Sequence, residues 1–295
     1  MTDSTVEALW HAHRRRVLDV SYRMLGTLTD AEDALQETFL RLTRADLEEI
    51  EDVEGWLVTV SARVCLDMLR ASATRRRYIG PWLPAPLIEQ HVSAPDPADR
   101  VTLDDTVRIA LLAVLHTLSP AERVAFVLHD VFGLQFETIS DIVGRSPAAT
   151  RKLASRARGA IRDDPEPRFK VTAAQAQSVA ERFAAACTSG NIADLAAVLA
   201  PDVVGEFDSG GRIAGTPRTA QLGAELVSIV LGHSLFGAGA DFRVTDINSQ
   251  PGIIVSLRDQ VMVVINLETD GHRIRAIRAI GNPDKLAHLN RENTT

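Results

Sequence analysis

The sequence has little of several features that would assign a chain to a specialised class of protein. Its 295 residues include only two cysteines, Cys65 and Cys187, and aromatic residues make up 5%. No apolar run approaches the ~20 residues that span a bilayer, and the first residues lack the apolar stretch of a secretory signal. No Cys/His cluster has the spacing of metal ligands. We therefore expect a cytoplasmic protein that uses no membrane segment, metal or cofactor.

Positive charge is scarce overall but is concentrated in one stretch. The chain has 32 Lys and Arg against 39 Asp and Glu, a net charge of −7. The stretch "GRSPAATRKLASRARGAIR", residues 144–162, nevertheless holds six basic side chains and no acidic one. An exposed helix face usually mixes charges of both signs, because oppositely charged i,i+4 pairs stabilise it. A local basic face without internal partners favours binding to a nucleic acid, whose phosphates supply the opposite charge.

Composition divides the chain into helical, proline-rich and mixed parts. Residues 1–77 and 106–163 show apolar residues at helical spacing, whereas residues 78–105 are rich in proline, which is incompatible with a regular helix. Beyond the break at 164–170, residues 171–295 combine helices, one of them near 217–231, with four alternating runs typical of strands. These runs are 241–248, 252–257, 260–268 and 272–280, with Asp270–Gly271 as a hairpin turn. The order predicts two all-α domains followed by an α+β domain.

The basic stretch is predicted to be the second helix of a helix-turn-helix motif. Ser146 followed by Pro147 is typical of a helix start, and Gly144 closes the short helix before it. Helical spacing separates an apolar face, which includes Leu153 and Ala157, from the basic face. A helix-turn-helix uses its second helix to contact DNA. The candidate DNA-binding residues are Arg145, Ser146, Thr150, Arg151, Lys152, Ser155, Arg156 and Arg158.

Three motifs in order narrow the choice of family. "TDAEDALQETFLRL" (29–42), "VEGWLVTVSARVCLDMLRASATRRR" (53–77) and the helix-turn-helix stretch resemble the core-polymerase-binding, promoter-melting and minus-thirty-five-reading parts of bacterial sigma factors. The short, two-domain architecture resembles the extracytoplasmic-function (ECF) group. By spacing alone, the polar face of 29–42 is most simply a solvated helix face. The resemblance implies instead that it contacts core RNA polymerase and that the protein directs transcription from promoter DNA.

The resemblance also implies roles for particular residues of the first domain. Those implied to contact core polymerase are Asp33, Gln36, Glu37, Phe39 and Leu40. Those implied to hold melted promoter DNA are Trp56, Arg63, Arg70, Arg75, Arg76 and Arg77. Basic grooves of this kind suit single-stranded DNA.

The last 125 residues resemble a SnoaL-like domain, a cone of helices on a curved antiparallel sheet. One branch of ECF factors carries this domain as a fused extension with three short signatures, which implies an internal regulator. Here they read "WLP" (Trp82, Leu83, Pro84), "DSGGR" (Asp208, Gly210, Gly211, Arg212, with Ser209 in place of a glycine) and "NPDKL" (Asn282, Pro283, Asp284, Lys285, Leu286). Trp82 is a large apolar residue in a segment too proline-rich to fold alone. We expect these three segments to meet and to set the spacing of the domains.

Two other classes of function remain open at this point. A one-component regulator would combine a helix-turn-helix with a ligand-binding cone, and SnoaL-like cones include isomerases and cyclases. Catalysis in such cones uses a carboxylate base with a Tyr or acid donor in an apolar pocket, but the last domain has no Tyr. Asp208 beside two glycines resembles a turn carboxylate more than a buried base. We therefore expect no enzyme, and a small-molecule ligand in the cone stays an alternative.

Overall fold

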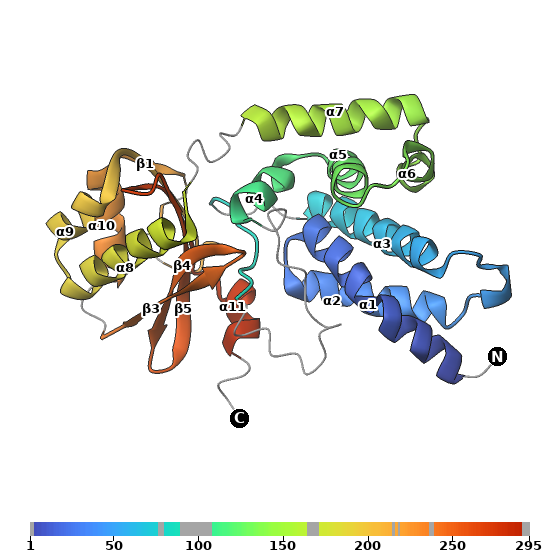
Figure 1. Cartoon of the computed structure of the whole chain (residues 1–295), viewed down its shortest axis with the longest axis horizontal. Coiled ribbons are helices and arrows are strands. Elements are labelled where there is room, and N and C mark those ends of the chain that lie inside the picture. The colour runs from blue at the N-terminus through green and yellow to red at the C-terminus, as the bar shows by residue number, and fades with distance from the viewer. Residues whose placement is uncertain are drawn as a thin grey trace. The chain divides into compact units, whose positions relative to one another are not determined.

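The computed structural model of the chain separates into two compact units (Figure 1). One comprises Met1–Arg77 and Val92–Asp164, and the other comprises Tyr78–His91 and Pro165–Thr295. We call them the helical unit and the cone unit. The structure describes residues 3–75, 80–88, 108–163, 171–213, 216–217, 219–235 and 239–290. The proline-rich residues 80–88 belong to the cone unit, although they lie between helices of the other unit in the sequence.

The first part of the helical unit is built from three helices that pack on one another. They are α1 (Asp3–Leu25), α2 (Leu28–Leu42) and α3 (Val53–Arg75), with a short 3-10 turn, η1 (Leu47–Glu49), before α3. Thr27 caps α2 through its hydroxyl oxygen, which accepts a hydrogen bond from the backbone of Asp30. The buried stripe of α2 follows the helical repeat: Ala31, Ala34, Leu35, Thr38 and Leu42.

The second part of the helical unit contains the predicted helix-turn-helix. It comprises α4 (Ile109–Thr117), α5 (Pro120–Phe126), a π-helical turn η5 (Val127–Val131), α6 (Phe136–Val143) and α7 (Pro147–Asp163). Ser119 and Glu122 form the capping box of α5. Gly144 ends α6 in the left-handed conformation (φ 69°), which a residue without a Cβ adopts at little cost. Local sequence signals therefore fix both ends of the turn between α6 and α7.

The cone unit is a six-stranded sheet with helices α8, α9 and α10 packed on one face (Figure 1). In chain order its elements are α8 (Ala173–Ser189), α9 (Ile192–Val198), β1 (Leu199–Asp208), β2 (Gln221–Leu222), α10 (Ala224–Leu235), β3 (Asp241–Ile247), β4 (Gln250–Leu257), β5 (Gln260–Thr269), β6 (Ile274–Ile280) and α11 (Pro283–Asn290). The strand order is β2-β1-β6-β5-β4-β3. All pairs are antiparallel except β1 with β6, which run parallel.

The two faces of the sheet are covered by different parts of the chain. Alternate residues of β4 and β5, such as Ile253 and Ile265, join the apolar core with Phe183 of α8 and Leu231 of α10. The intervening residues, such as Val264, point to the other face and are also buried. Residues Leu83–Ile88 and the helix α11 supply buried side chains there, and Ile88 forms a single antiparallel bridge with Ile247 at the end of β3. The segment 80–88 is thus an integral part of the cone unit.

The structure confirms the predicted fold class and refines its details. All four expected strands form β3–β6, and Asp270 and Gly271 lie in the β5–β6 hairpin. Sequence reasoning missed β1, the short β2 and the helix α11, and it placed α10 several residues too early. Among the described residues, no helix is both long and apolar enough to span a membrane.

Candidate functional site

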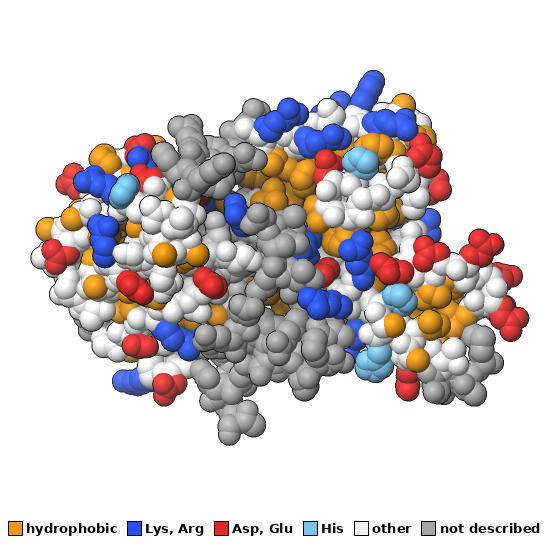
Figure 2. Space-filling view, in the orientation of Figure 1, with side chains coloured by type: hydrophobic (Ala, Val, Ile, Leu, Met, Phe, Trp, Pro, Cys, Tyr) orange, Lys and Arg blue, Asp and Glu red, His pale blue; other side chains and the backbone are white. Residues whose placement is uncertain are grey.

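The second helix of the helix-turn-helix, α7, has a continuous basic face (Figure 2). Lys and Arg side chains gather over this helix in the space-filling view, and Arg145, Arg151, Lys152, Arg156 and Arg162 are exposed. Ser146 caps the helix as predicted, since its hydroxyl oxygen accepts a hydrogen bond from the backbone of Ala149 at 3.3 Å. The basic residues therefore lie on the surface of a helix whose start is fixed by its own sequence.

Several arginines of this face have acidic partners that lie outside α7. Arg151 pairs with Glu137 of α6 at 2.9 Å, Arg158 with Asp130 of η5 at 3.3 Å, and Arg156 with Glu122 of α5 at 3.8 Å. The interpretation of an unpartnered basic face is thus wrong for these three arginines, because residues distant in sequence supply the carboxylates. No ion pair joins Lys152 or Arg145 to another residue in the described part of the chain.

The buried face of α7 is rotated slightly from the one expected. Thr150, Ala154 and Ala157 are fully buried, whereas Leu153 is only partly so. The Thr150 hydroxyl donates to the backbone oxygen of Ser146 at 3.0 Å. Thr150 was predicted to lie with the DNA-binding residues, but its side chain packs inward. Ser155 is exposed beside the basic residues, as predicted.

The polar face of α2 carries the residues expected to bind core polymerase. Asp33 and Gln36 are exposed, and Leu40 exposes 46% of its surface, unusual for a leucine on a charged helix. Glu37 is held by Arg41 at 2.9 Å, one turn away. Phe39 is half-buried because its ring packs on Trp10 of α1, with the ring centroids 5.1 Å apart.

The residues expected to hold melted DNA lie along α3. Trp56 is half-buried near its start, Arg63 is exposed, and Arg70 is exposed with Asp67 at 3.7 Å. The side chain of Arg75, and all of Arg76 and Arg77, lie outside the described residues. In the part of the predicted cluster that the structure describes, Arg63 and Arg70 are exposed on the surface of α3 and do not line a closed groove.

The three short signatures meet in the cone unit, at a contact that we call the linker dock. Its centre is Asp208, at the end of β1, which is 1% exposed. The Asp208 carboxylate pairs with the Lys285 ammonium of α11 at 2.7 Å and accepts a hydrogen bond from the backbone N–H of Leu83 at 2.8 Å. Lys285 also donates to the backbone oxygen of Leu83, and its ammonium lies 4.2 Å from the Trp82 ring centroid. The buried pair of Asp208 and Lys285 thus binds both the backbone N–H and the backbone oxygen of Leu83.

Leu83 is buried more completely than Trp82, which was expected to be the docking residue. Leu83 is fully buried and Pro84 is buried beside it, while Trp82 is half-buried and covers Lys285. Asp208 was predicted to be a turn carboxylate. It does accept a hydrogen bond from the backbone of Gly210 at 3.0 Å, but it is also a buried ion-pair partner, so the turn interpretation was incomplete.

The loop after Asp208 and the start of α11 support the dock from outside. Gly210 has a φ of 58°, and a Cβ there would lie 2.6 Å from the Asn282 amide nitrogen, so only glycine fits. Asn282 in turn accepts a hydrogen bond from the backbone of Asp284 and caps α11, whose first residue is Pro283. Ser209 stands where the signature that this loop resembles has a glycine, but its φ is not positive. Three more residues of these two segments lie here: Arg212 pairs with Asp284 at 2.9 Å, Gly211 has a backbone φ of 75°, and Leu286 is buried.

Two residues of the dock were missed by sequence reasoning. Asn248, in the tight β3–β4 turn, exchanges two 2.8 Å hydrogen bonds with the backbone of Leu87, and it is fully buried. The His288 Nε2 atom lies 2.9 Å from the backbone oxygen of Pro86. An Asn-Ser pair between strands signals a turn, since Asn tolerates positive φ, but nothing local indicates that its amide binds a distant segment.

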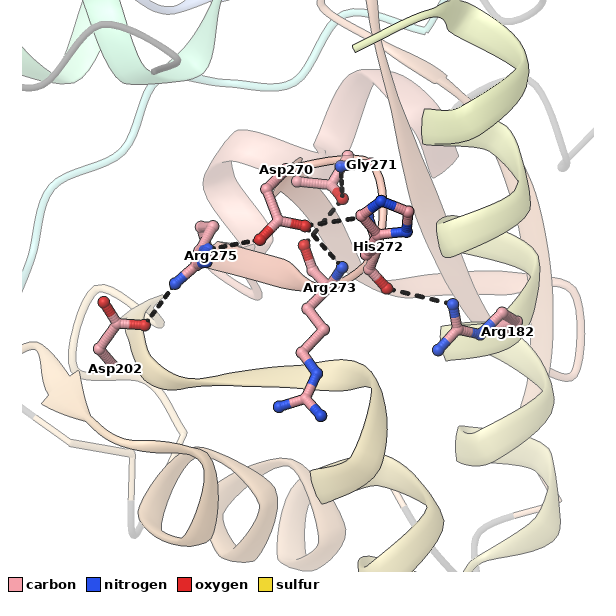
Figure 3. Close-up of polar contacts among 8 residues, drawn as sticks. Arg182, Asp202, Asp270, Gly271, His272, Arg273 and Arg275 are labelled. Atoms are coloured by element: carbon pink, nitrogen blue, oxygen red, sulfur yellow. Dashed lines mark hydrogen bonds and ion pairs between the residues drawn. The ribbon is translucent and has the colours of Figure 1, made fainter. Parts of the chain in front are cut away.

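A second polar network closes the opposite end of the sheet (Figure 3). The Asp270 carboxylate accepts hydrogen bonds from the backbone of His272 and Arg273 and from the Arg275 guanidinium, which also reaches Asp202 at 2.7 Å. Burial alone would raise the pKa of Asp270, but these donors outweigh it and lower the pKa below its usual value. The network is an Asx-type turn braced across the sheet, and its chemistry is structural.

The described residues hold neither a candidate metal site nor a thiol that is ionised at neutral pH. In the described ranges, no group of three or more His, Cys, Asp or Glu side chains could hold a metal ion. Burial raises the pKa of the Cys65 and Cys187 thiols to about 12, so neither is a thiolate at neutral pH.

Models of two known domain families match the helical unit. Sigma-70 region 2 matches residues 9–75, and Sigma-70, region 4 matches residues 108–161. The two matches fall on α1–α3 and on α4–α7, which we therefore call σ2 and σ4.

Whole-length relatives extend the likeness to the cone unit. The chain is 36% identical to the probable ECF RNA polymerase sigma factor SigI of Mycobacterium tuberculosis over 290 residues, 97% of each chain. It is 34% identical to the ECF RNA polymerase sigma factor SigJ of the same organism, covering 94% of this chain and 92% of that one. The crystal structure of M. tuberculosis SigJ superposes with a TM-score of 0.72 at 32% identity, covering 96% of this chain and 98% of that one. These similarities do not favour a one-component regulator or an enzyme. The chain belongs to the extracytoplasmic-function RNA polymerase sigma factors, transcription initiation factors that bind core RNA polymerase and promoter DNA.

Proposed function

We propose that the cone unit regulates this ECF sigma factor from within its own chain, by binding the linker between σ2 and σ4. The linker dock is the observation that carries the proposal. It immobilises residues 80–88, nine of the 33 residues between the end of α3 at Arg75 and the start of α4 at Ile109. Docking of 80–88 divides the connection between σ2 and σ4 into two shorter stretches, whereas release makes it one long stretch, so docking changes how σ2 and σ4 can be spaced.

The contacts of the dock select one register of the linker segment. Leu83 and Leu87 each form hydrogen bonds through both backbone groups, and four linker residues from Leu83 to Ile88 are almost completely buried apolar side chains. Backbone pairing fixes the register of an extended segment, and pockets for its side chains add specificity, as in peptide recognition by sheet edges. This combination supports a defined bound state of the linker, which a regulatory element needs.

Roles in σ2 and σ4 follow from the exposure of the motif residues. The face of α2 that carries Asp33, Gln36 and Leu40 contacts core polymerase. An exposed leucine among polar groups suits a protein partner. Arg63 and Arg70 of α3 contact melted promoter DNA together with Trp56. Arg145, Lys152 and the arginines of α7 contact the upstream promoter element.

The proposal is tested by releasing the linker without altering the core of the cone. Leu83→Asp introduces a charge at a fully buried linker position whose backbone N–H binds the Asp208 carboxylate, so the dock should open. Limited proteolysis of the linker reports release. Run-off transcription with core polymerase, on a promoter selected by the holoenzyme from random-sequence DNA, reports activity.

The control is Arg182→Ala, which removes an exposed hydrogen bond to the backbone oxygen of His272, at the end of the sheet away from the dock. We expect Leu83→Asp to change transcription several-fold and the control to leave it nearly unchanged. Deleting the cone from 171 onward and deleting only Asn282–Thr295 should also change transcription, to different extents. The proposal is wrong if the linker is cleaved readily in Leu83→Asp while transcription stays at the level of the full chain.

The cytoplasm is the proposed location, because that is where the polymerase acts. A small-molecule ligand in the cone is a weaker candidate. Buried side chains of Phe183, Phe207 and Leu231 occupy the core between sheet and helices. Regulation through the dock needs no such ligand.

A further inference from the structure

One arginine of α7 is held by two side chains of α6, the first helix of the helix-turn-helix. The Nη2 atom of Arg151 donates a hydrogen bond to Oε1 of Glu137 at 2.9 Å. The guanidinium carbon of Arg151 also lies 5.4 Å from the centre of the Phe136 ring. An ion pair and a ring contact on the same guanidinium restrict its rotamers together. Arg151 is therefore oriented by α6 within the folded domain.

Phe136 is itself held in place by the π-helical turn η5. The His129 ring stacks on the Phe136 ring, with the ring centroids 3.9 Å apart and the planes at 30°. The Nδ1 atom of His129 lies 2.9 Å from the backbone oxygen of Leu134, and it donates the hydrogen because a carbonyl oxygen only accepts. His129 is thus fixed at one end and packs on the ring that contacts Arg151.

We call His129, Phe136 and Glu137 the arginine support. Lys152, the next residue after Arg151, is exposed and has neither an ion pair nor a ring contact with the described residues. The two neighbours also differ in chemistry: an ammonium is a point charge that suits a phosphate, whereas a planar guanidinium can donate two parallel hydrogen bonds. The arginine support therefore acts on the one of the two side chains that has directional donors.

Stability alone does not account for the arginine support. The Arg151 and Glu137 side chains are 54% and 63% exposed, and pairs so exposed contribute little to folding. The Glu137 carboxylate should also repel the phosphates that a basic helix attracts. It does, however, bind Nη2 and leave the other donors of the guanidinium without a hydrogen bond to the described residues. This arrangement favours direction over affinity.

The position of Arg151 in α7 suits contact with a base. Arg151 is the fifth residue of the helix, which begins at Pro147 and packs on α6. The N-terminal residues of the second helix of a helix-turn-helix contact base edges, while the first helix crosses the DNA backbone. In the major groove, the O6 and N7 acceptors of guanine match two parallel donors of an arginine. An arginine oriented in advance loses less conformational freedom when it binds them.

We propose that Arg151 recognises one guanine of the upstream promoter element, and that the arginine support fixes the direction of its guanidinium. Lys152 contacts phosphate without regard to sequence. Glu137, Phe136 and His129 are positioning residues, because they act through Arg151. The inference rests on the proposed contact between α7 and promoter DNA, but not on regulation by the cone.

Selection from randomised DNA tests the role of Arg151. Holoenzyme made from the full-length chain and core polymerase is bound to duplexes randomised over the upstream element, and sequencing gives the base preference at each position. Arg151→Lys keeps the charge but removes the planar pair of donors. We expect the preference for guanine to fall about ten-fold at one position, with the other positions and the salt dependence of binding unchanged.

The matched control for Arg151→Lys is Arg162→Lys. It makes the same substitution at an exposed arginine of the same helix, about three turns or ~16 Å further along the axis. Because that position is far from the N-terminal end of α7, no base preference should change.

Glu137→Gln and Phe136→Leu test the arginine support. Glu137→Gln removes a charge that repels phosphate, so the affinity for random duplex DNA should rise or stay the same while the guanine preference falls about three-fold. A merely structural role of Glu137 would not produce these opposite changes. Phe136→Leu should lower the preference likewise, and Phe136→Tyr, which keeps the ring, should retain it. Circular dichroism reports whether each variant is folded.

The possible failures are distinguishable. An unchanged guanine preference in Arg151→Lys overturns recognition by Arg151. A loss in Arg151→Lys that is shared by neither Glu137→Gln nor Phe136→Leu overturns the positioning role of the arginine support. If the native chain selects no base in the upstream element, the contact between α7 and the promoter is itself wrong, and this inference fails with it.

Discussion

The linker dock of the cone unit and the basic face of α7 in the helical unit use charged side chains differently. In the cone unit, Asp208 and Lys285 are buried and paired at 2.7 Å, and Arg278 is held between Glu206 and Glu268 at 3.0 and 2.9 Å. In the helical unit, Arg151 pairs with Glu137 at a similar distance of 2.9 Å, but both side chains are more than half exposed. Water screens the exposed pair and competes for it, whereas the buried pair has no alternative partner. Pairs of similar length therefore stabilise the fold where they are buried, as at Asp208, and leave charges available to DNA where they are exposed, as on α7.

Arg123, on α5, differs from both groups, because it is buried and no carboxylate among the described residues pairs with it. A buried pair resists separation, since breaking it leaves two uncompensated charges. A buried lone charge gains solvation when its surroundings open. The comparison thus explains why the linker dock, with its buried pair, suits a stable joint.

The largest expected effect comes from breaking the buried pair of the dock. Lys285→Ala leaves the Asp208 carboxylate buried without its partner, and the free energy of unfolding of the cone unit should fall by about 3–5 kcal/mol. Arg212→Ala, at the exposed pair with Asp284, should lower it by less than about 1 kcal/mol. Urea unfolding followed by circular dichroism measures both. The double variant Asp208→Asn with Lys285→Met should recover most of the loss. Equal losses from the two single alanine variants would remove the distinction between buried and exposed pairs.

A smaller effect is expected at the part-buried Asp270. Because its folded-state pKa is depressed, the ionised carboxylate stabilises the fold at pH values above about 4, and this contribution is lost as the pH falls through the lower folded-state pKa. Asp270→Asn should lower the free energy of unfolding by about 1–2 kcal/mol at pH 7. The difference from the unaltered chain should shrink as the pH is lowered toward 3. Thermal melts across this pH range measure it, and a pH-independent difference would mean that charge is not the cause.

The exposed charges of α7 should affect DNA binding more than stability. Lys152→Ala should reduce the slope of log affinity against log salt by about one for nonspecific duplex DNA. Glu137→Gln releases Arg151 and should raise the affinity by up to about five-fold while changing stability by less than about 1 kcal/mol. Fluorescence anisotropy over a salt series measures both variants. An unchanged slope for Lys152→Ala would place this residue outside the DNA interface.

No effect is expected from the two thiols. Burial raises the pKa of Cys65 and Cys187 to about 12, so the native chain should not react with iodoacetamide at pH 8 within an hour, whereas the urea-unfolded chain should react at both positions. Mass spectrometry of the alkylated chain provides the measurement. Rapid labelling of either thiol in the folded state would show that its unit opens locally.

The sequence alone was sufficient for the elements whose signals are local. The caps at Ser119 and Ser146, the glycine at 144 and the helical repeat of α2 each depend on residues within four positions of one another. The charge excess of α7 and the hairpin at Asp270 also depend on residues close together in the sequence. The helix-turn-helix and four strands could therefore be predicted. The short signatures also indicated that three distant segments matter, although not which atoms join them.

Only the tertiary structure decided the contacts between residues far apart in the chain. The partners of Arg151 and Arg158 come from other helices, Asp208 meets Lys285 across 77 positions, and Arg123 meets Met24 across 99. Strand β1 was missed for a related reason: it pairs in parallel with β6, which lies about 70 residues later, and its burial depends on that pairing. Local propensity carries no information about such pairings, because the free energy of each comes from removing both partners from water at one place in the folded chain.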